Sequence, residues 1–147
     1  MNNKDVGSFL SGLRGNRVKR VRRVHYVHEG RVAVDEGPVE LTFADGAVVL
    51  FDGGSDGESL TVKGSRWVDP FPEPLSPENV EFVKESGKWT AFDVTRAQPY
   101  EKLIEDRIVN AIPIKGRKDK ITGVVLVFSG NSVRIEIQGD ETRVFFD

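Results

Sequence analysis

The two histidines of this chain, His25 and His28, are the side chains best suited to proton transfer or metal binding near neutral pH. They lie in a valine-rich segment that favours a β-strand, where residues three apart point to opposite faces, so the two rings cannot share one metal ion. The chain has no cysteine, which excludes disulfides, thiol catalysis and cysteine-bound zinc. We therefore predict no catalytic residue, no metal site and no cofactor.

Residues 52–58, rich in glycine and acid, begin like a calcium-binding loop. Acidic residues occupy the first and fifth positions and a glycine the sixth, where such a loop turns sharply. The third position is Gly54 and the twelfth is Lys63, so two of the expected oxygen ligands are missing. The segment is therefore more typical of an acidic turn than of a calcium site.

The middle of the chain is strongly acidic, with 12 acids and three bases among residues 35–85, although the whole chain has a net charge of only −2. Such a surface would suit a basic partner, and an exposed tryptophan within it would anchor an interface. The candidate partner-binding residues are Asp52, Asp56, Glu58, Trp67 and Asp69. The more general expectation for Trp67 and Trp89 is that they cover the ends of the core.

One dense basic run precedes the acidic segment and could neutralise the phosphates of a nucleic acid. It consists of Arg17, Lys19, Arg20, Arg22 and Arg23. Only Tyr26, at its edge, is placed to stack on a base, and the sequence pI of about 5.8 is far from that of a basic binding domain. We expect instead that the run lies beside acidic neighbours of its own fold.

A chain of 147 residues with 38% apolar and 30% charged residues fits one soluble globular domain. No apolar run approaches the roughly 18 residues that a membrane helix needs, and residues 1–15 lack the apolar core of a signal peptide. We expect a single domain over residues 1–147, located in the cytoplasm, with no membrane partner.

Within this domain, the apolar residues of segment 39–62 recur in segment 124–146. The pairs are Val39 and Val124, Leu41 and Leu126, Phe43 and Phe128, Val48 and Val133, and Leu50 and Ile135 at an offset of 85, then Leu60 and Val144, and Val62 and Phe146 at an offset of 84. A lead-in recurs at an offset of 90, where Leu10, Leu13, Arg17 and Val18 fall on Tyr100, Leu103, Arg107 and Ile108. Each copy is typical of a short helix followed by antiparallel hairpins.

The repeat units span about residues 5–63 and 97–147, with a connector over about 64–96. One unit alone leaves an apolar face uncovered, whereas two units bury both faces. We therefore predict a mainly β, or β-rich α+β, fold in which the two units form one barrel or sandwich, with short helices at the ends.

Local signals add detail to this prediction. The valine spacing of residues 16–34 predicts strand interrupted by a bulge or bend near residues 20–23. Ser76 and Pro77 predict a helix start and Gly87 its end, with Val80 and Val83 facing inward. A strand is expected over residues 88–94, and a helix over about 99–105.

The repeated lead-in, a leucine followed four residues later by Arg-Val or Arg-Ile before a hairpin, resembles small uncharacterised bacterial β domains with an internal duplication. Some of these are immunity partners of polymorphic toxins. The resemblance implies a non-catalytic cytoplasmic interaction module that inhibits a basic protein, and is compatible with a homodimer. A small-molecule-binding barrel is one alternative, and a nucleic-acid-associated protein using the basic run is another.

Overall fold

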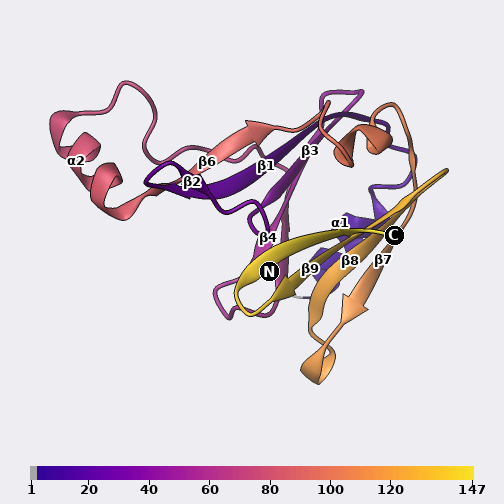
Figure 1. Ribbon diagram of the computed structural model, residues 1–147. Helices are drawn as coiled ribbons and strands as arrows, with labels where there is room; N and C mark the ends of the chain where they lie inside the picture. Colours follow the sequence, from indigo (N-terminus) through magenta and orange to yellow (C-terminus); the bar gives the residue numbers. More distant parts are fainter. Residues whose placement is uncertain (1–2) are drawn as a thin grey trace.

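The computed structural model describes residues 3–147, and it confirms a mainly β protein, with 45% strand and 17% helix (Figure 1). The two α-helices are α1 (Asn3–Ser11) and α2 (Pro77–Ser86), and two short 3-10 turns are η1 (Tyr100–Leu103) and η2 (Arg117–Asp119). The strands are β1 (Val18–His28), β2 (Arg31–Val32), β3 (Val39–Phe43), β4 (Val48–Gly53), β5 (Leu60–Lys63), β6 (Lys88–Asp93), β7 (Ile108–Lys115), β8 (Ile121–Phe128), β9 (Ser132–Gln138) and β10 (Glu141–Phe146).

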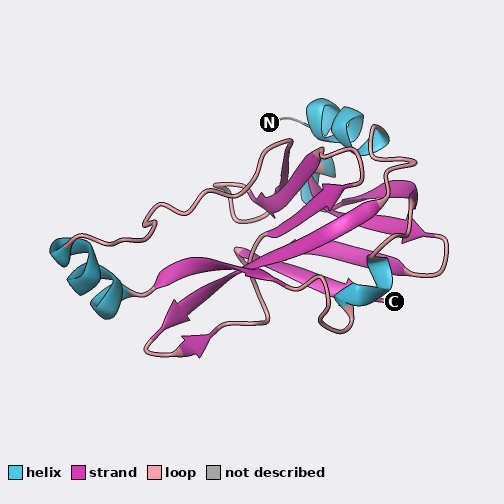
Figure 2. Cartoon of the chain, turned by 90° about the horizontal axis from the view of Figure 1, so that it is seen from above, coloured by secondary structure: helices cyan, strands magenta, loops and turns pink. Residues whose placement is uncertain are grey.

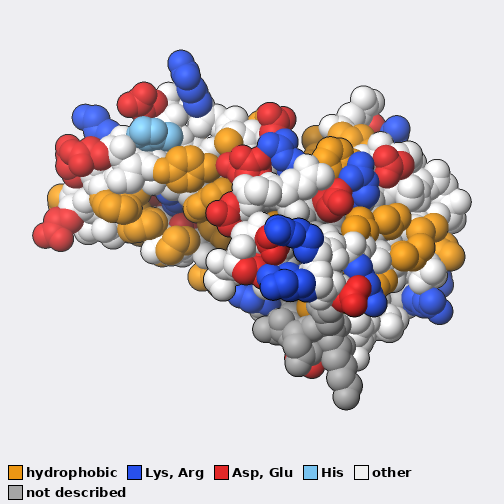
Figure 3. Space-filling model, turned by 90° about the horizontal axis from the view of Figure 1, so that it is seen from below, with side chains coloured by type: hydrophobic (Ala, Val, Ile, Leu, Met, Phe, Trp, Pro, Cys, Tyr) orange, Lys and Arg blue, Asp and Glu red, His pale blue; other side chains and the backbone are white. Residues whose placement is uncertain are grey.

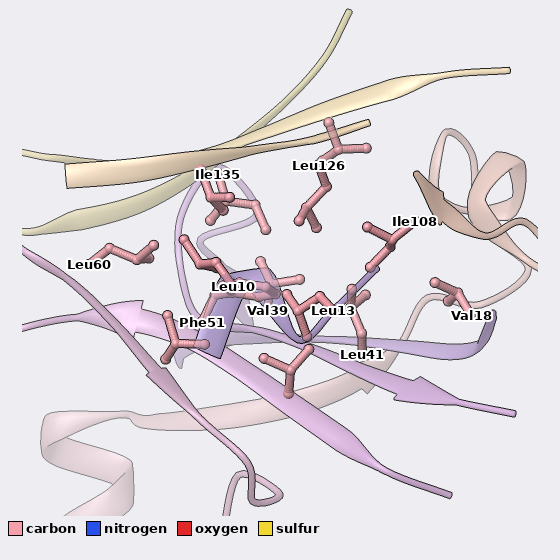
Figure 4. Close-up of a cluster of buried hydrophobic side chains, with 14 of the residues drawn as sticks. Leu10, Leu13, Val18, Val39, Leu41, Phe51, Leu60, Ile108, Leu126 and Ile135 are labelled. Carbon is pink, nitrogen blue, oxygen red and sulfur yellow. The ribbon is translucent and has the colours of Figure 1, made fainter. Parts of the chain in front are cut away.

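These strands form two antiparallel sheets. The first has the order β2-β1-β3-β4-β5, with β6 also paired to β1, and the second has the order β10-β9-β8-β7. Neither sheet closes on itself within residues 3–147, so the barrel form of the prediction is not supported. The two sheets instead share one apolar core, which the side chains of α1 also enter (Figure 4).

The second sheet repeats the pairing of β1, β3, β4 and β5 in the first. Val18 pairs with Phe43 as Ile108 pairs with Phe128, and Val21 pairs with Leu41 as Ala111 pairs with Leu126. The same irregularity interrupts both ladders, between Val18 and Arg20 and between Ile108 and Asn110. A bulge is thus present at Lys19, one residue before the predicted range of 20–23, and its counterpart at Val109 lies at the offset of 90 that the sequence indicated.

The lead-ins of the two units also pair with each other, around an isolated bridge between Arg17 and Arg107. The Gly15 amide donates to the Ile108 carbonyl (2.8 Å), and the Glu105 amide donates to the Val18 carbonyl (2.8 Å). Positions 15 and 105 are equivalent, as are 18 and 108, so each of these bonds is the two-fold image of the other. The predicted second helix is only the 3-10 turn η1, but it occupies the place that the end of α1 has in the first unit.

The strand pairings show that the sequence alignment of the two sets of hairpins is wrong by one or two residues. Val49 pairs with Leu41 as Val133 pairs with Leu126, so Val49, rather than Val48, is the counterpart of Val133. The cause is the first turn, because Phe43 bonds to the carbonyl of Ala47, whereas Phe128 bonds to that of Asn131, one residue nearer. A second shortening follows in the next turn. Val62 pairs with Phe51 as Val144 pairs with Ile135, which makes Val62 the counterpart of Val144.

The far half of β1, together with β2, β6 and α2, extends from the two-sheet body as an arm, with α2 at its tip (Figure 2). The start of α2 is capped by the Ser76 hydroxyl, which accepts the Asn79 amide, and Gly87 ends the helix, as predicted. The expectation that Val80 and Val83 face inward is wrong, since none of residues 77–86 is buried. The middle of the connector therefore projects from the body, while Trp67 and Val94 near its two ends pack against the body.

Candidate interaction site

A cavity of about 210 Å³ lies where the two sheets meet at the base of the arm, and both tryptophans of the chain line it. Its walls also carry three carboxylates and a threonine. The lining residues are Glu36, Gly37, Pro38, Asp52, Trp67, Trp89, Asp140 and Thr142. We refer to this cavity as the tryptophan–acid pocket.

Residues from both repeat units build this pocket. Asp52 is on β4 of the first sheet, while Asp140 and Thr142 come from the turn and strand that follow β9 in the second. The Gly37 amide donates to the Thr142 carbonyl (3.0 Å) and fastens the two sheets together there. Gly37 has a φ of +127°, and a Cβ at this position would lie 1.6 Å from the Val24 carbonyl oxygen, so only glycine fits.

Trp67 is fixed in this pocket through its backbone, by a buried ion pair on the neighbouring strands. Arg22 donates to both carboxylate oxygens of Glu40, at 2.8 Å and 2.6 Å. The Trp67 amide donates to the same carboxylate (2.8 Å), and Arg22 donates to the Trp67 carbonyl (3.3 Å). The pair thus satisfies the backbone donor and acceptor of a residue that belongs to no strand.

Two carboxylates of the pocket, Asp52 and Glu36, have raised pKa values. Burial raises the pKa of Asp52, although the Gly53 amide and the Lys63 charge oppose that rise. Burial also raises the pKa of Glu36, and the nearby carboxylate of Glu141 adds to the effect. Groups whose pKa values rise because their negative charge is poorly solvated would gain from a cation placed among them.

Of the five predicted partner-binding residues, Asp52 and Trp67 line the pocket. Asp56 and Glu58 lie on the adjoining turn, where Lys120 contacts both, at 3.1 Å and 3.2 Å. This turn touches the pocket wall, because the Asp140 amide donates to the Gly57 carbonyl (3.1 Å). Hydrogen bonds from the Ser59 hydroxyl and from backbone amides hold the pKa of Asp56 far below its usual range.

The fifth predicted residue, Asp69, lies in the connector and pairs with Lys88 (2.7 Å), which also donates to the Phe71 carbonyl (2.9 Å). Asp69 therefore fastens the segment before α2 to β6. The sequence prediction missed Glu36, Trp89, Asp140 and Thr142. Of these, Asp140 and Thr142 join the pocket only through the contact between the sheets, whereas Trp89 reaches it from β6 of the arm. Trp89 does not cover the core, since it is 38% exposed on β6 and packs edge-on against Tyr26.

Three of the five residues of the basic run pair with acidic neighbours of its own fold, as expected. Lys19 pairs with Glu105 (2.6 Å), Arg20 with Asp93 (3.3 Å) and Arg22 with Glu40 (2.6 Å). Arg23 is 2% exposed and donates to the Tyr100 hydroxyl and to the Gly37 carbonyl. These contacts weigh against the interpretation of the run as a nucleic-acid-binding strip. Arg17 and Arg23 make no ion pair with the acids that the structure describes, and of these two Arg17 is the more exposed.

The two histidines have separate environments. The His25 ring is buried, and its Nδ1 lies 2.7 Å from the Glu36 carbonyl oxygen, while burial lowers its pKa. His28 is part-exposed beside Glu29. Ser55 has the glycine spacing of a nucleophile elbow, but it lies on a turn between two strands rather than between a strand and a helix.

No family model, curated protein or solved structure matches this chain. Among the residues that the structure describes, no group of three or more histidine and acidic side chains is arranged to hold a metal ion. No helix of the described chain has the length and apolar character needed to cross a membrane.

Proposed function

We propose that this protein is a non-catalytic interaction module, and that the tryptophan–acid pocket receives a lysine or arginine side chain of a basic partner protein. The observation that carries the proposal is the meeting of two indole rings and three carboxylates in one cavity. Indole faces attract cations, most strongly where water is excluded, and carboxylates supply the opposite charge.

The size of the pocket supports a side chain rather than a larger ligand. Its volume of about 210 Å³ is below the roughly 300–1,000 Å³ typical of pockets for drug-sized molecules. A metabolite-sized cation remains the second candidate, and it would use the same indole faces. Such a ligand would not need the surface around the pocket.

That surface carries exposed apolar residues suited to a protein partner. Val34, 62% exposed, lies two residues before Glu36, and Val68, 78% exposed, follows Trp67. Figure 3 shows apolar side chains gathered along one face of the arm, with charged groups around them. An apolar strip on the arm, together with an acidic pocket at the base of the arm, is complementary to a basic protein that presents a cationic side chain among apolar ones.

Fluorescence tests the proposal directly, because both tryptophans of the chain line the pocket. The wild type would be titrated with the amides of acetyl-arginine and acetyl-lysine and with a lysine-rich peptide. We expect a saturable change in emission, and an affinity that increases as the pH rises through the raised pKa of Asp52. Asp52→Asn should bind about tenfold more weakly or worse, because one charge partner is lost.

Glu101→Gln is the matched control, since it removes one exposed negative charge that does not line the pocket. An equal response to the neutral amide of acetyl-norleucine, or unchanged binding by Asp52→Asn, would rule out cation recognition.

The more specific hypothesis is that the protein is an immunity-type inhibitor. It predicts that coexpression relieves the toxicity of a basic protein encoded beside this one, and that Trp67→Ala abolishes the relief.

A further inference from the structure

We propose that Arg17 and Arg107 together form a binding site for a phosphate group, on the two-fold axis that relates the repeat units. This site lies outside the tryptophan–acid pocket and does not depend on the function proposed for it. The fold places the like charges of Arg17 and Arg107 directly opposite each other.

The hydrogen bonds on either side of the Arg17–Arg107 bridge define how close the two residues lie. The Ile108 amide donates to the Asn16 carbonyl (3.0 Å), and the Val18 amide donates to the Asp106 carbonyl (3.0 Å). Arg17 and Arg107 are therefore the narrow, non-hydrogen-bonded pair of an antiparallel ladder, with Cα atoms about 4.5 Å apart. In such a pair the two side chains project to the same face.

That face is the outer one, because the neighbours Val18 and Ile108 are both buried in the core. Both arginines line a surface groove of about 330 Å³, whose other walls are Gly15, Asn16, Ala44 and Asp45. Like charges directly opposite each other on paired strands are destabilising. An anion between the two guanidinium groups would remove that repulsion.

The acids near the pair form other contacts. Neither arginine makes an ion pair within 4.0 Å with any carboxylate that the structure describes. Glu105, whose pKa is lowered by Lys19 and by the charge of Arg17, is hydrogen-bonded to Lys19 at 2.6 Å. The Asp106 carboxylate accepts from the Ser129 hydroxyl and from the Arg107 amide. Asp45, the one acid in the groove, accepts the Ala47 amide (2.9 Å), and Arg17 Nε is shielded from solvent without a partner among the described residues.

The charge and geometry of the pair favour a phosphate over a simple carboxylate. Each guanidinium presents parallel N–H donors, and two of them offer two positive charges to one dianion. Each repeat unit contributes one arginine, so the site exists only where the two units meet. A free phosphate ion and the phosphate of a nucleotide share this chemistry.

The test measures binding at constant ionic strength and pH 8, with sodium chloride replaced stepwise by sodium phosphate, sulfate, acetate or adenosine monophosphate. We expect phosphate to shift the backbone amide resonances of residues 15–18 and 105–108 and to raise the melting temperature. Sulfate should act similarly and acetate much less. A stronger effect of the nucleotide would identify a nucleotide as the source of the phosphate, and an equal effect would identify the free ion.

Arg17→Gln and Arg107→Gln should each weaken phosphate binding about tenfold or more, since each removes charge-assisted hydrogen bonds. Arg31→Gln, at an exposed position on β2, is the matched control and should bind as the wild type does. Equal effects of acetate and phosphate, equal loss in all three variants, or no resonance shift in the wild type would overturn the proposal. The resonance shifts of the wild type test phosphate binding even if one variant does not fold.

Discussion

The backbone amide of Trp67 lies 2.8 Å from the carboxylate of Glu40, a side chain that is only 1% exposed. Burial alone would raise the pKa of Glu40, but hydrogen bonds from Arg22 and from the Trp67 amide outweigh it and lower the pKa. Glu40 is therefore ionised at neutral pH. A charge buried in the first sheet thus determines the position of a tryptophan in the candidate site.

We predict that Arg22→Met destabilises the protein by about 3–5 kcal/mol, because it leaves the buried Glu40 carboxylate without its partner. The measurement is urea unfolding at pH 7. The double variant Arg22→Met with Glu40→Leu should recover much of that loss, since no charge is then left buried. It should still show altered tryptophan emission and weaker cation binding, because Trp67 has lost its anchor.

Lys19→Met provides the comparison for this pair. It breaks the exposed ion pair with Glu105 and should change stability little, because solvent screens such pairs. An effect of Arg22→Met as small as that of Lys19→Met would contradict the role assigned to the buried pair. Native emission in the double variant would show that Trp67 is held by other contacts.

The contribution of Asp52 to folding stability should depend on pH in the opposite sense to that of an ordinary ion-paired acid. Because its pKa is raised in the folded protein, the fold favours the protonated form, and the stability this gives at low pH is lost as the pH rises through the folded pKa. We predict that Asp52→Asn raises the melting temperature at pH 7 and has little effect below about pH 4. Melting curves from pH 3 to pH 8 would measure this.

A lower melting temperature for Asp52→Asn at pH 7 would mean that Asp52 is stabilised as a carboxylate, contrary to the burial argument. Glu101→Gln, at an exposed position on η1, should show no such crossover. A group that weakens the fold at neutral pH is the kind of residue that function, rather than folding, retains.

The repeat was the part of this structure most open to prediction, because apolar periodicity and turn residues are local signals. The lead-in offset of 90 extends to single hydrogen bonds around Arg17 and Arg107. The hairpin offsets were wrong by one or two residues. Alternating apolar residues fix which face a strand buries, but they do not fix how many residues a turn takes up.

The pocket could be predicted only in part. Asp52 and Trp67 were identified as acidic and aromatic residues in an acidic segment, which is a property of composition. Asp140 and Thr142 join them through the contact between Gly37 and Thr142, residues 105 positions apart, and no local pattern reports such a contact. The sequence favours a core position for Trp89 because tryptophans are highly buried on average, and no local pattern indicates that the arm projects.

Phe43 and Phe128 occupy equivalent positions at the ends of β3 and β8, and each is 3% exposed. Truncation of a buried phenylalanine typically costs about 3–5 kcal/mol, so we predict a loss of that size for Phe43→Ala and for Phe128→Ala. Denaturant unfolding of both variants measures it. Near-native stability of either variant would show that the two halves do not share one core at that layer.

Gly15 and Glu105 also occupy equivalent positions, and both have a positive φ, of +84° and +68°. We predict that Gly15→Ala destabilises the protein by about 1–2 kcal/mol, the cost of the left-handed region for an ordinary residue. Open space surrounds Gly15, so no steric clash would add to this cost. Gly130→Ala, also in open space but without a positive φ, should be neutral in thermal melts, and an equal loss there would reject the backbone explanation.

The arm should open independently of the two-sheet body. None of the residues of α2 is buried, and Phe82, half exposed, packs on Phe71 alone among the aromatic rings that the structure describes. Local opening of such a helix exposes little additional apolar surface, so it requires far less free energy than global unfolding. We predict that the amides of residues 80–86 exchange with deuterium much faster than those of β3 and β8.

Phe82→Ser should accordingly change the free energy of global unfolding by less than about 0.5 kcal/mol, as surface substitutions usually do. Protection of α2 equal to that of β8 would show that the helix packs more firmly than its exposure indicates. A basic partner that covers the arm as well as the pocket would slow exchange in α2 and β6 together. A partner that uses the pocket alone would slow it only around Trp89, because that is where the arm contributes to the pocket wall.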